Sequence, residues 1–509
     1  AWTVALAMLG SLVFAVGLAP MLGAFVLRRP RDAAAAEPWL VRGLLAVYRP
    51  VVGFCVRRAW VAVLLAGALL ATGAGLLPRL GSEFTPRLRE GTIVVRLTLA
   101  PSIALDESRR VTQLVERRLL ALPEIAEVVS RIGRGEVGAH TDPVNSAEMY
   151  VRLAPPETWR QAHDQDGIED LIRDELADLP GVLASLTQPI ESTVDELLEG
   201  VRAELAVKVF GEELETLTHL AGEIAAVVRT VAGAADVQVD QAAGQPQLLI
   251  RLDRQALARY GLNVAEVQRT LGAAVGGRIV GQIYEGARRF PVRVRYPEHD
   301  RDTKARIADI MVSTPDGLRI PLSEVATLTE IVGPRQITRE DNQRFVAVQC
   351  NVVGRDIGSF VDDARGAIAA NVDLPPGYLT TWGGQYRLQQ EANRRLLVVV
   401  PVVMLVILLL QFAHFGSLRH SLLILLNIPL ALVGGIAALW LTGTNLSVPA
   451  SIGFIALFGI ALENAMVLVT CMNQLVAGGA SLREAAVAGA GLRLRPVLMT
   501  ALTTALGLI

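Results

Sequence analysis

The chain has 509 residues, of which 52% are hydrophobic and 19% are charged, and its formal net charge is −2. This composition argues against a soluble protein of this length, and the near-neutral charge gives no indication of nucleic-acid binding. The apolar residues collect towards the two ends of the chain. Three cysteines, Cys55, Cys350 and Cys471, lie far apart, so we expect free thiols that pack as small hydrophobic side chains.

Five apolar runs are long enough to cross a bilayer, which takes about 20 residues. They comprise residues 2–26, 60–78, 396–412, 421–441 and 448–472, and a sixth run begins after Pro496. The chain starts and stops within apolar runs, so we expect it to lack both ends of the natural protein. Seven arginines between the first two runs predict that this loop is cytoplasmic. The stretch from 81 to about 390 is then expected on the outer side.

The middle stretch repeats an order of strand, helix, strand and strand. Strands are predicted at 92–99, 126–130 and 148–153, with a helix at 105–122. The order recurs as 205–210, a helix at 214–231, 237–239 and 247–252, and again as 344–352, a helix at 360–370, and 379–382. Such units indicate ferredoxin-like α+β subdomains. Gly- and Pro-rich stretches predict joints at 154–156, 244–246, 333–334 and 375–377.

The predicted fold is an α-helical membrane bundle plus an α+β periplasmic domain of ferredoxin-like βαβ subdomains. The expected segments are transmembrane helices at 1–27, 60–79, 393–413, 420–442 and 448–472, a cytoplasmic linker with an amphipathic helix at 28–59, the periplasmic domain at 80–392, a cytoplasmic segment at 473–495, and the start of a truncated transmembrane helix at 496–509.

Glu463 is the only charged residue between Arg419 and Arg483, and it lies near the middle of the run 448–472. A charge at this depth costs about 2.5–3.5 kcal/mol on insertion scales. A residue kept at that cost usually faces a partner, a cavity or a proton path. We therefore predict that Glu463 carries protons, and that Asn464 supplies hydrogen bonds beside it. The alternative is that Glu463 stays protonated and bonds a neighbouring helix.

A loop at 133–145 carries three potential metal ligands, Glu136, His140 and Asp142. Carboxylate and imidazole groups suit zinc, cobalt and nickel better than they suit soft metals such as copper(I). The alternative, which the sequence leaves open, is a solvated loop whose glycines form turns and whose polar side chains face water.

Seven segments resemble the heavy-metal branch of the resistance–nodulation–division efflux transporters. They are GSEFTP (81–86), TVDELLEG (193–200), VKVFG (207–211), ARYGLN (258–263), PRQITRE (334–340), NVVGRD (351–356) and LRPVLMT (494–500). They follow the order of the second half of such a transporter, and the resemblance covers essentially the whole chain.

This resemblance implies an inner-membrane homotrimer. Its outer part would divide into porter subdomains and a docking subdomain, and the docking subdomain would meet a periplasmic adaptor protein and an outer-membrane channel. It implies a secondary proton/cation antiporter, driven by the proton motive force without a cofactor, and not an enzyme. Glu463 matches a position that is acidic in the metal branch. The main proton-carrying aspartates of the family belong to a span that this chain lacks.

The resemblance also bears on the choice of metal. Copper–silver pumps use outer-domain methionines, which align near Arg96, Ser146 and Leu220, whereas the outer domain here has only Met149 and Met311. Thioether sulfur is a soft ligand. We therefore expect zinc, cobalt, cadmium or nickel as the exported cation.

Three other interpretations compete with this one. A multidrug pump of the same superfamily would be favoured by an aromatic cleft, but aromatic residues make up only 5% of the chain. A membrane-anchored periplasmic assembly or sensor module would need only two spans. A membrane metalloenzyme would need a ligand set such as HExxH, which the sequence does not contain.

Overall fold

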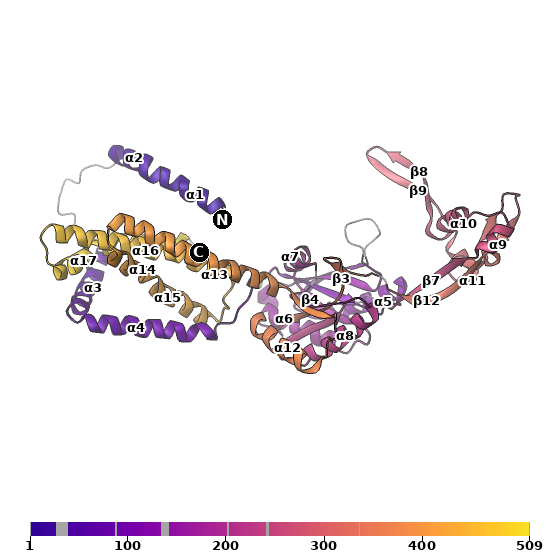
Figure 1. Ribbon diagram of the computed structural model, residues 1–509, viewed down its shortest axis with the longest axis horizontal. Coiled ribbons are helices and arrows are strands. Elements are labelled where there is room, and N and C mark those ends of the chain that lie inside the picture. Colours follow the sequence, from indigo (N-terminus) through magenta and orange to yellow (C-terminus); the bar gives the residue numbers. More distant parts are fainter. Residues whose placement is uncertain are drawn as a thin grey trace. The chain divides into compact units, whose positions relative to one another are not determined.

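The chain forms two compact units in the computed structural model (Figure 1). The structure describes residues 2–26, 39–86, 89–133, 142–200, 203–240, 244–334 and 336–507. The helical unit comprises Ala1–Arg79, Val400–Thr442 and Ile452–Ile509, and the α+β unit comprises Leu80–Val399 and Gly443–Ser451.

Six helical stretches of the described chain are long and apolar enough to cross a membrane, as the hydropathy pattern predicts. The helices of these six stretches are α1 (Trp2–Val13) and α2 (Ala19–Val26), joined by a π-helical turn at Phe14–Leu18, then α4 (Ala59–Leu76), α13 (Gln385–Phe415), α14 (Leu418–Leu425), α15 (Asn427–Thr442), α16 (Val448–Ala477) and α17 (Leu482–Gly507). A further helix, α3 (Trp39–Arg57), lies between α2 and α4 in the chain. A small apolar cluster from α14, α15 and α16 is buried around Ile424, Ile428 and Leu462. Most other apolar side chains of these helices are exposed, which suits a lipid environment.

The last helix begins earlier than the sequence predicts. We expected a cytoplasmic segment at 473–495 and a helix after Pro496, but α17 begins at Leu482 and continues through Pro496. Proline removes one helical hydrogen bond, and this loss is tolerated in apolar helices whose neighbours compensate for it.

The first sheet of the α+β unit is a β-α-β-β-α-β unit. Its elements are β1 (Thr92–Thr98), α5 (Leu105–Leu119), β2 (Ile125–Ile132), β3 (Ser146–Leu153), α6 (Gln165–Leu176) and β4 (Leu183–Thr187), and α7 (Pro189–Glu199) follows them. The strand order is β2-β3-β1-β4, and each pair is antiparallel. Both helices bury an apolar stripe against the sheet, with Val115 and Ile168 fully buried. This order is that of the split βαβ motif.

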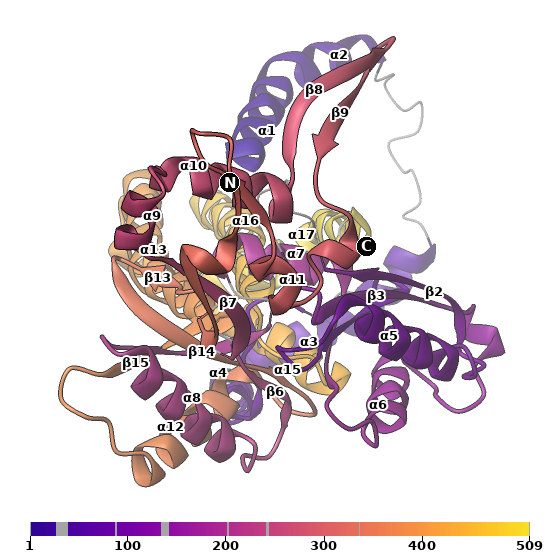
Figure 2. The ribbon, with the colours of Figure 1, turned by 90° about the vertical axis from the view of Figure 1, so that its right-hand side faces the viewer.

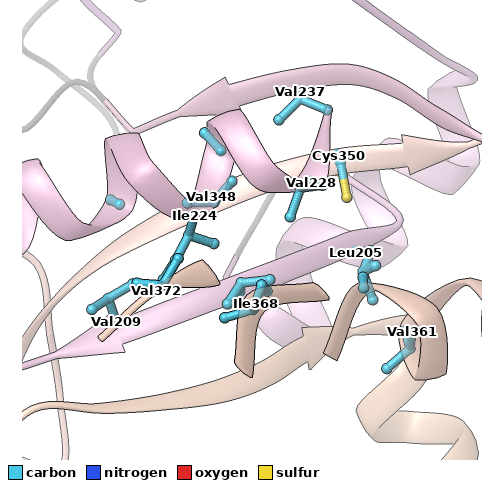
Figure 3. Packing of buried hydrophobic residues seen from close by; sticks show 14 of the residues in the cluster. Leu205, Val209, Ile224, Val228, Val237, Val348, Cys350, Val361, Ile368 and Val372 are labelled. Atoms are coloured by element: carbon cyan, nitrogen blue, oxygen red, sulfur yellow. The ribbon is translucent and has the colours of Figure 1, made fainter. Parts of the chain in front are cut away.

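The second sheet has the same connectivity with a long insertion. It comprises β5 (Leu205–Phe210), α8 (Leu214–Val228), β6 (Ala234–Val239), β14 (Gln343–Val352), α12 (Ile357–Asn371) and β15 (Leu379–Gly384), with the short β13 (Arg339–Glu340) beside β14. The strand β14 lies between β5 and β6, and β15 flanks β5. Figure 3 shows Ile224 and Val228 of α8 in the core with Val348 and Cys350 of β14. Burial raises the pKa of the Cys350 thiol to about 12, which agrees with a thiol that acts as a hydrophobic side chain.

The insertion at Gln245–Gly333 forms an arm with its own core. Its stem pairs β7 (Gln245–Leu252) with β12 (Ala326–Gly333) along their whole length. Between them lie α9 (Arg254–Arg259), α10 (Val264–Leu271), β8 (Arg278–Glu285), β9 (Arg288–Val294), α11 (Lys304–Ala308), β10 (Met311–Ser313) and β11 (Arg319–Pro321). The strands β8 and β9 form a hairpin in which every residue is exposed (Figure 2).

The arm corrects one part of the predicted repeat. Residues 247–252 form a strand as expected, but this strand pairs with β12 and does not complete the second sheet. The second sheet is completed by β14 and β15, which the sequence suggested as a third repeat. Alternating residues predict a strand and carry no information on its partner. The predicted joints at 244–246 and 333–334 coincide with the two ends of the arm.

Candidate functional site

A buried carboxylate lies between two arginines on the first sheet. In the register of the strands, Glu148 of β3 is opposite both Arg96 of β1 and Arg131 of β2. Arg96 Nη2 donates to Glu148 Oε1 at 2.9 Å, and Arg131 donates to the other carboxylate oxygen. Burial raises the pKa of the Glu148 carboxyl, but the two guanidiniums outweigh this and hold that pKa below its usual range. Position 96 therefore carries a guanidinium that is paired with a carboxylate.

A small polar cavity lies beside this ion pair, between the first and second sheets. Its volume is about 160 Å³, and its lining includes Arg96, Thr98 and Ser146 from the first sheet and Gln238 and Gln349 from the second. Thr98 Oγ1 donates to Gln238 Oε1 at 3.0 Å and thereby links the two sheets. The described side chains that line the cavity offer oxygen and nitrogen atoms, and none of them contains sulfur.

The methionines of the α+β unit lie elsewhere. Met149 is fully buried in the core of the first sheet, and Met311 lies on β10 in the arm. Leu220, near which the sequence predicts a third family methionine to align, is buried in the core of the second sheet. The structure therefore brings Arg96 and Ser146 to one cavity and places Leu220 away from it.

Of the three predicted metal ligands, only Asp142 falls within the described residues, and it lines the same cavity together with Asp240. Glu136 and His140 lie outside the described residues. Within the described ranges, no group of three or more His, Cys, Asp or Glu side chains is arranged to hold a metal ion. The metal site at Glu136, His140 and Asp142 stays a prediction.

Asp236 connects the two sheets through a buried hydrogen-bond network that the sequence did not reveal. One of its carboxylate oxygens accepts from Leu186 N at 3.1 Å and from Asn351 Nδ2 at 2.9 Å, and the other accepts from Arg173 Nε at 3.3 Å. Only 6% of the Asp236 side chain is exposed. Its φ of 54° lies in the left-handed region, which Asp tolerates better than most residues. A run of small residues around Asp236 gave no pattern from which this role could be predicted.

The two residues predicted for proton transfer face different ways on α16. Glu463 is exposed, and within the described part of the chain it makes no hydrogen bond or ion pair. Asn464 is half-buried and lines a cavity of about 430 Å³ within the helical unit. Successive residues of an α-helix are about 100° apart, which explains the divergence.

The cavity at Asn464 contains further polar side chains that the sequence analysis missed. Tyr48 of α3, Asn427 of α15 and Arg493 of α17 line it, with small residues such as Ala461 between them. Four helices therefore contribute polar groups to this cavity. Their positions far apart in the chain left no local motif from which the cluster could be found.

Comparison with known proteins identifies the family. The profile of the AcrB/AcrD/AcrF family matches residues 1–509. The chain belongs to this family. The cobalt-zinc-cadmium resistance protein CzcA of Cupriavidus metallidurans is 38% identical to the chain over 518 residues, which cover 100% of the chain and 48% of that protein. Protein HelA of Legionella pneumophila is 40% identical, with coverage of 100% and 49%. The cation efflux system protein CusA of Escherichia coli K12 is 31% identical, with coverage of 100% and 50%.

A solved structure supports the same assignment. A crystal structure of a heavy metal efflux pump (crystal form II) matches this chain with a TM-score of 0.79 and 35% identity, over 92% of the chain and 47% of that protein. The predicted resemblance to resistance–nodulation–division transporters of the heavy-metal branch is confirmed. The chain spans about half the length of the curated relatives that it matches.

Proposed function

We propose that the chain forms part of an inner-membrane pump that exports divalent heavy-metal cations in exchange for protons. The observation that carries this proposal is the similarity over the whole chain to resistance proteins named for cobalt, zinc, cadmium and nickel, at 36–38% identity. Six helices of membrane-spanning length and a separate α+β unit agree with a transporter. A two-helix anchor for a sensor or assembly module would need fewer spans.

The chemistry of the polar cavity favours zinc, cobalt, cadmium or nickel over copper or silver. Asp142 and Asp240 line it with carboxylate oxygens, and Arg96 and Ser146, near which the methionines of copper–silver pumps are expected to align, line it as well. Borderline cations accept oxygen and imidazole ligands, whereas copper(I) and silver prefer thioethers. We propose that the exported cation passes this cavity, with Glu136 and His140, which precede Asp142 in the chain, as further ligands.

Glu463 is proposed to carry protons. It is exposed on a helix that is otherwise apolar, and a charge facing lipid at that depth would cost about 2.5–3.5 kcal/mol. The cost disappears if this face of α16 packs against other helices of the transporter, and relatives of this chain are about twice its length. Asn464, on the neighbouring face, is proposed to extend the path into the cavity with Arg493 and Tyr48.

The two sheets and the arm are proposed to have different roles outside the membrane. The two ferredoxin-like units would be porter subdomains, and the network at Asp236 would set their relative position. The arm, with its exposed β8–β9 hairpin, would be the docking subdomain that meets a periplasmic adaptor protein and an outer-membrane channel in a homotrimeric pump. No nucleic acid and no cofactor take part in this proposal.

Growth tests in a pump-deficient host examine the proposal directly. The complete gene is expressed with its own adaptor and channel, and growth is measured against zinc, cobalt, cadmium, nickel, copper and silver, with a dye and a hydrophobic drug as controls. Protection against one or more of the first four metals alone is expected. Protection against the drug would replace the proposal with a multidrug pump, and protection against nothing would favour a module without transport activity.

A further inference from the structure

The helical unit contains a groove whose lining residues differ from those of the cavity at Asn464. It runs between α3 and α17 and has a volume of about 1180 Å³. The side chain of Arg49 lies over α17 where that helix has a glycine, since a Cβ built on Gly491 would come 3.6 Å from Arg49 Nε. The two helices thus form the walls of one groove, and the same arginine reaches from one wall to the other.

Four arginines line this groove and have no partner among the described residues. Arg49 and Arg57 come from α3, and Arg483 and Arg495 come from α17. All four are exposed, and within the described chain none of them makes an ion pair or a hydrogen bond. Glu484, the acidic residue among the described lining residues, already accepts from Ser481 N and Oγ at 3.1 and 2.8 Å. The groove therefore carries a strong positive charge that the described chain does not neutralise.

The rest of the lining is apolar. Leu45 and Phe54 of α3 and Val487 and Leu492 of α17 separate the arginines. A ligand for such a surface needs a negative head for the guanidiniums and a hydrocarbon part for the side chains between them. Basic grooves between membrane helices bind the headgroups of anionic lipids in this way, and arginine matches phosphate with paired hydrogen bonds.

We propose that this groove binds an anionic phospholipid, with the phosphate at Arg49 and Arg495 and the acyl chains along the apolar walls. Charge complementarity selects the occupant, because a zwitterionic lipid or an apolar helix would leave the arginines uncompensated. The basic character of the segment around α3 places it on the cytoplasmic side. The inference rests on the insertion of α17 in a membrane and on α3 beside it, and not on which substrate the pump exports.

A lipid titration tests the inference. The complete gene product is purified, freed of lipid and titrated with phosphatidylglycerol or with phosphatidylcholine of the same chain length, and bound lipid is counted by native mass spectrometry. The test variant is Arg49→Gln/Arg495→Gln. The matched control is Arg394→Gln/Arg395→Gln. It removes the same charge from two exposed arginines of α13, a helix that does not line the groove. Melting temperatures confirm that both variants fold.

The expected result is a preference for phosphatidylglycerol that falls about tenfold or more in the groove variant and changes by less than about threefold in the control. Arg49→Lys/Arg495→Lys keeps the charge and should retain most of the preference. Equal losses in the groove variant and the control would overturn the proposal. Displacement of the lipid by glycerol 3-phosphate at the same concentration would also overturn it, since the site would then bind a free phosphate compound.

Discussion

The network at Asp236 offers a sharp test of how the two sheets are held together. Asp236→Asn is the chosen change, because asparagine is isosteric and tolerates the positive φ of this position. The amide places a donor where one carboxylate oxygen now accepts. Either Leu186 N and Asn351 Nδ2 or Arg173 Nε then faces a donor. Arg173 also loses the charge of Asp236, although it keeps the buried Glu169 carboxylate at 3.6 Å.

The size of the effect follows from burial. Breaking a buried ion pair costs about 3–5 kcal/mol, and the oxygen that asparagine retains recovers part of this, which leaves about 2–3 kcal/mol. Asp170→Asn is the matched control, because Asp170 binds the same Arg173 at 3.0 Å but is 63% exposed. An exposed pair contributes about 0–1 kcal/mol.

Hydrogen exchange of the complete protein measures the difference where it arises. The amide of Leu186 donates directly to Asp236, so the peptide that covers β4 reports on local opening. Exchange there should be about 30- to 150-fold faster in Asp236→Asn, which corresponds to 2–3 kcal/mol, and less than about fivefold faster in Asp170→Asn. Similar exchange in the two variants would refute the claim that Asp236 joins the sheets.

Three further predictions concern separate parts of the chain. Burial raises the pKa of the Glu148 carboxyl, but the two arginines outweigh burial and hold this pKa below its ordinary value of 4.5, so the charged carboxylate stabilises the fold at neutral pH. Glu148→Gln should therefore lower the melting temperature at pH 7, and the difference from the parent protein should narrow as the pH falls below 4.5 through the lowered native pKa. Glu463→Gln should abolish metal resistance while expression and trimer formation persist, whereas Glu324→Gln, at an exposed site in the α+β unit, should retain resistance, and resistance in the Glu463 variant would contradict the proton-carrier role. Removal of the exposed tip of the β8–β9 hairpin should leave the melting temperature unchanged and reduce co-purification of the adaptor protein, and unchanged co-purification would exclude the hairpin from docking.

Local patterns predicted most helices and strands because burial imposes the same periodicity on sequence and structure. The apolar runs became the six membrane-length helices, and β1, α5 and β5 lie within two or three residues of their predicted bounds. The exception among the helices, α17, shows that a proline does not fix a boundary in an apolar helix. Stretches rich in Gly and Pro located both ends of the arm.

Pairing between distant segments could not be read from the same patterns. The partner of β7 lies beyond the whole arm, and the network of Asp236 unites residues 50 to 115 positions apart. The sequence predicted that Glu463 and Asn464 lie on a helix. It could not predict whether each side chain faces a cavity or the surface, because this depends on which helices surround α16. The arginine groove combines α3 and α17, more than 400 residues apart in the chain, and no motif marks it.

Transport into vesicles tests the central claim most directly. The complete protein is reconstituted in proteoliposomes that enclose a zinc-sensitive dye, and zinc accumulation is followed with and without an imposed pH gradient. We predict accumulation that needs the gradient, stops when an ionophore collapses it, and is absent in Glu463→Gln. Zinc accumulation that is the same with and without the pH gradient would contradict the assignment of a proton-driven exporter of divalent cations. Transport of a hydrophobic dye in place of the metal would contradict it as well.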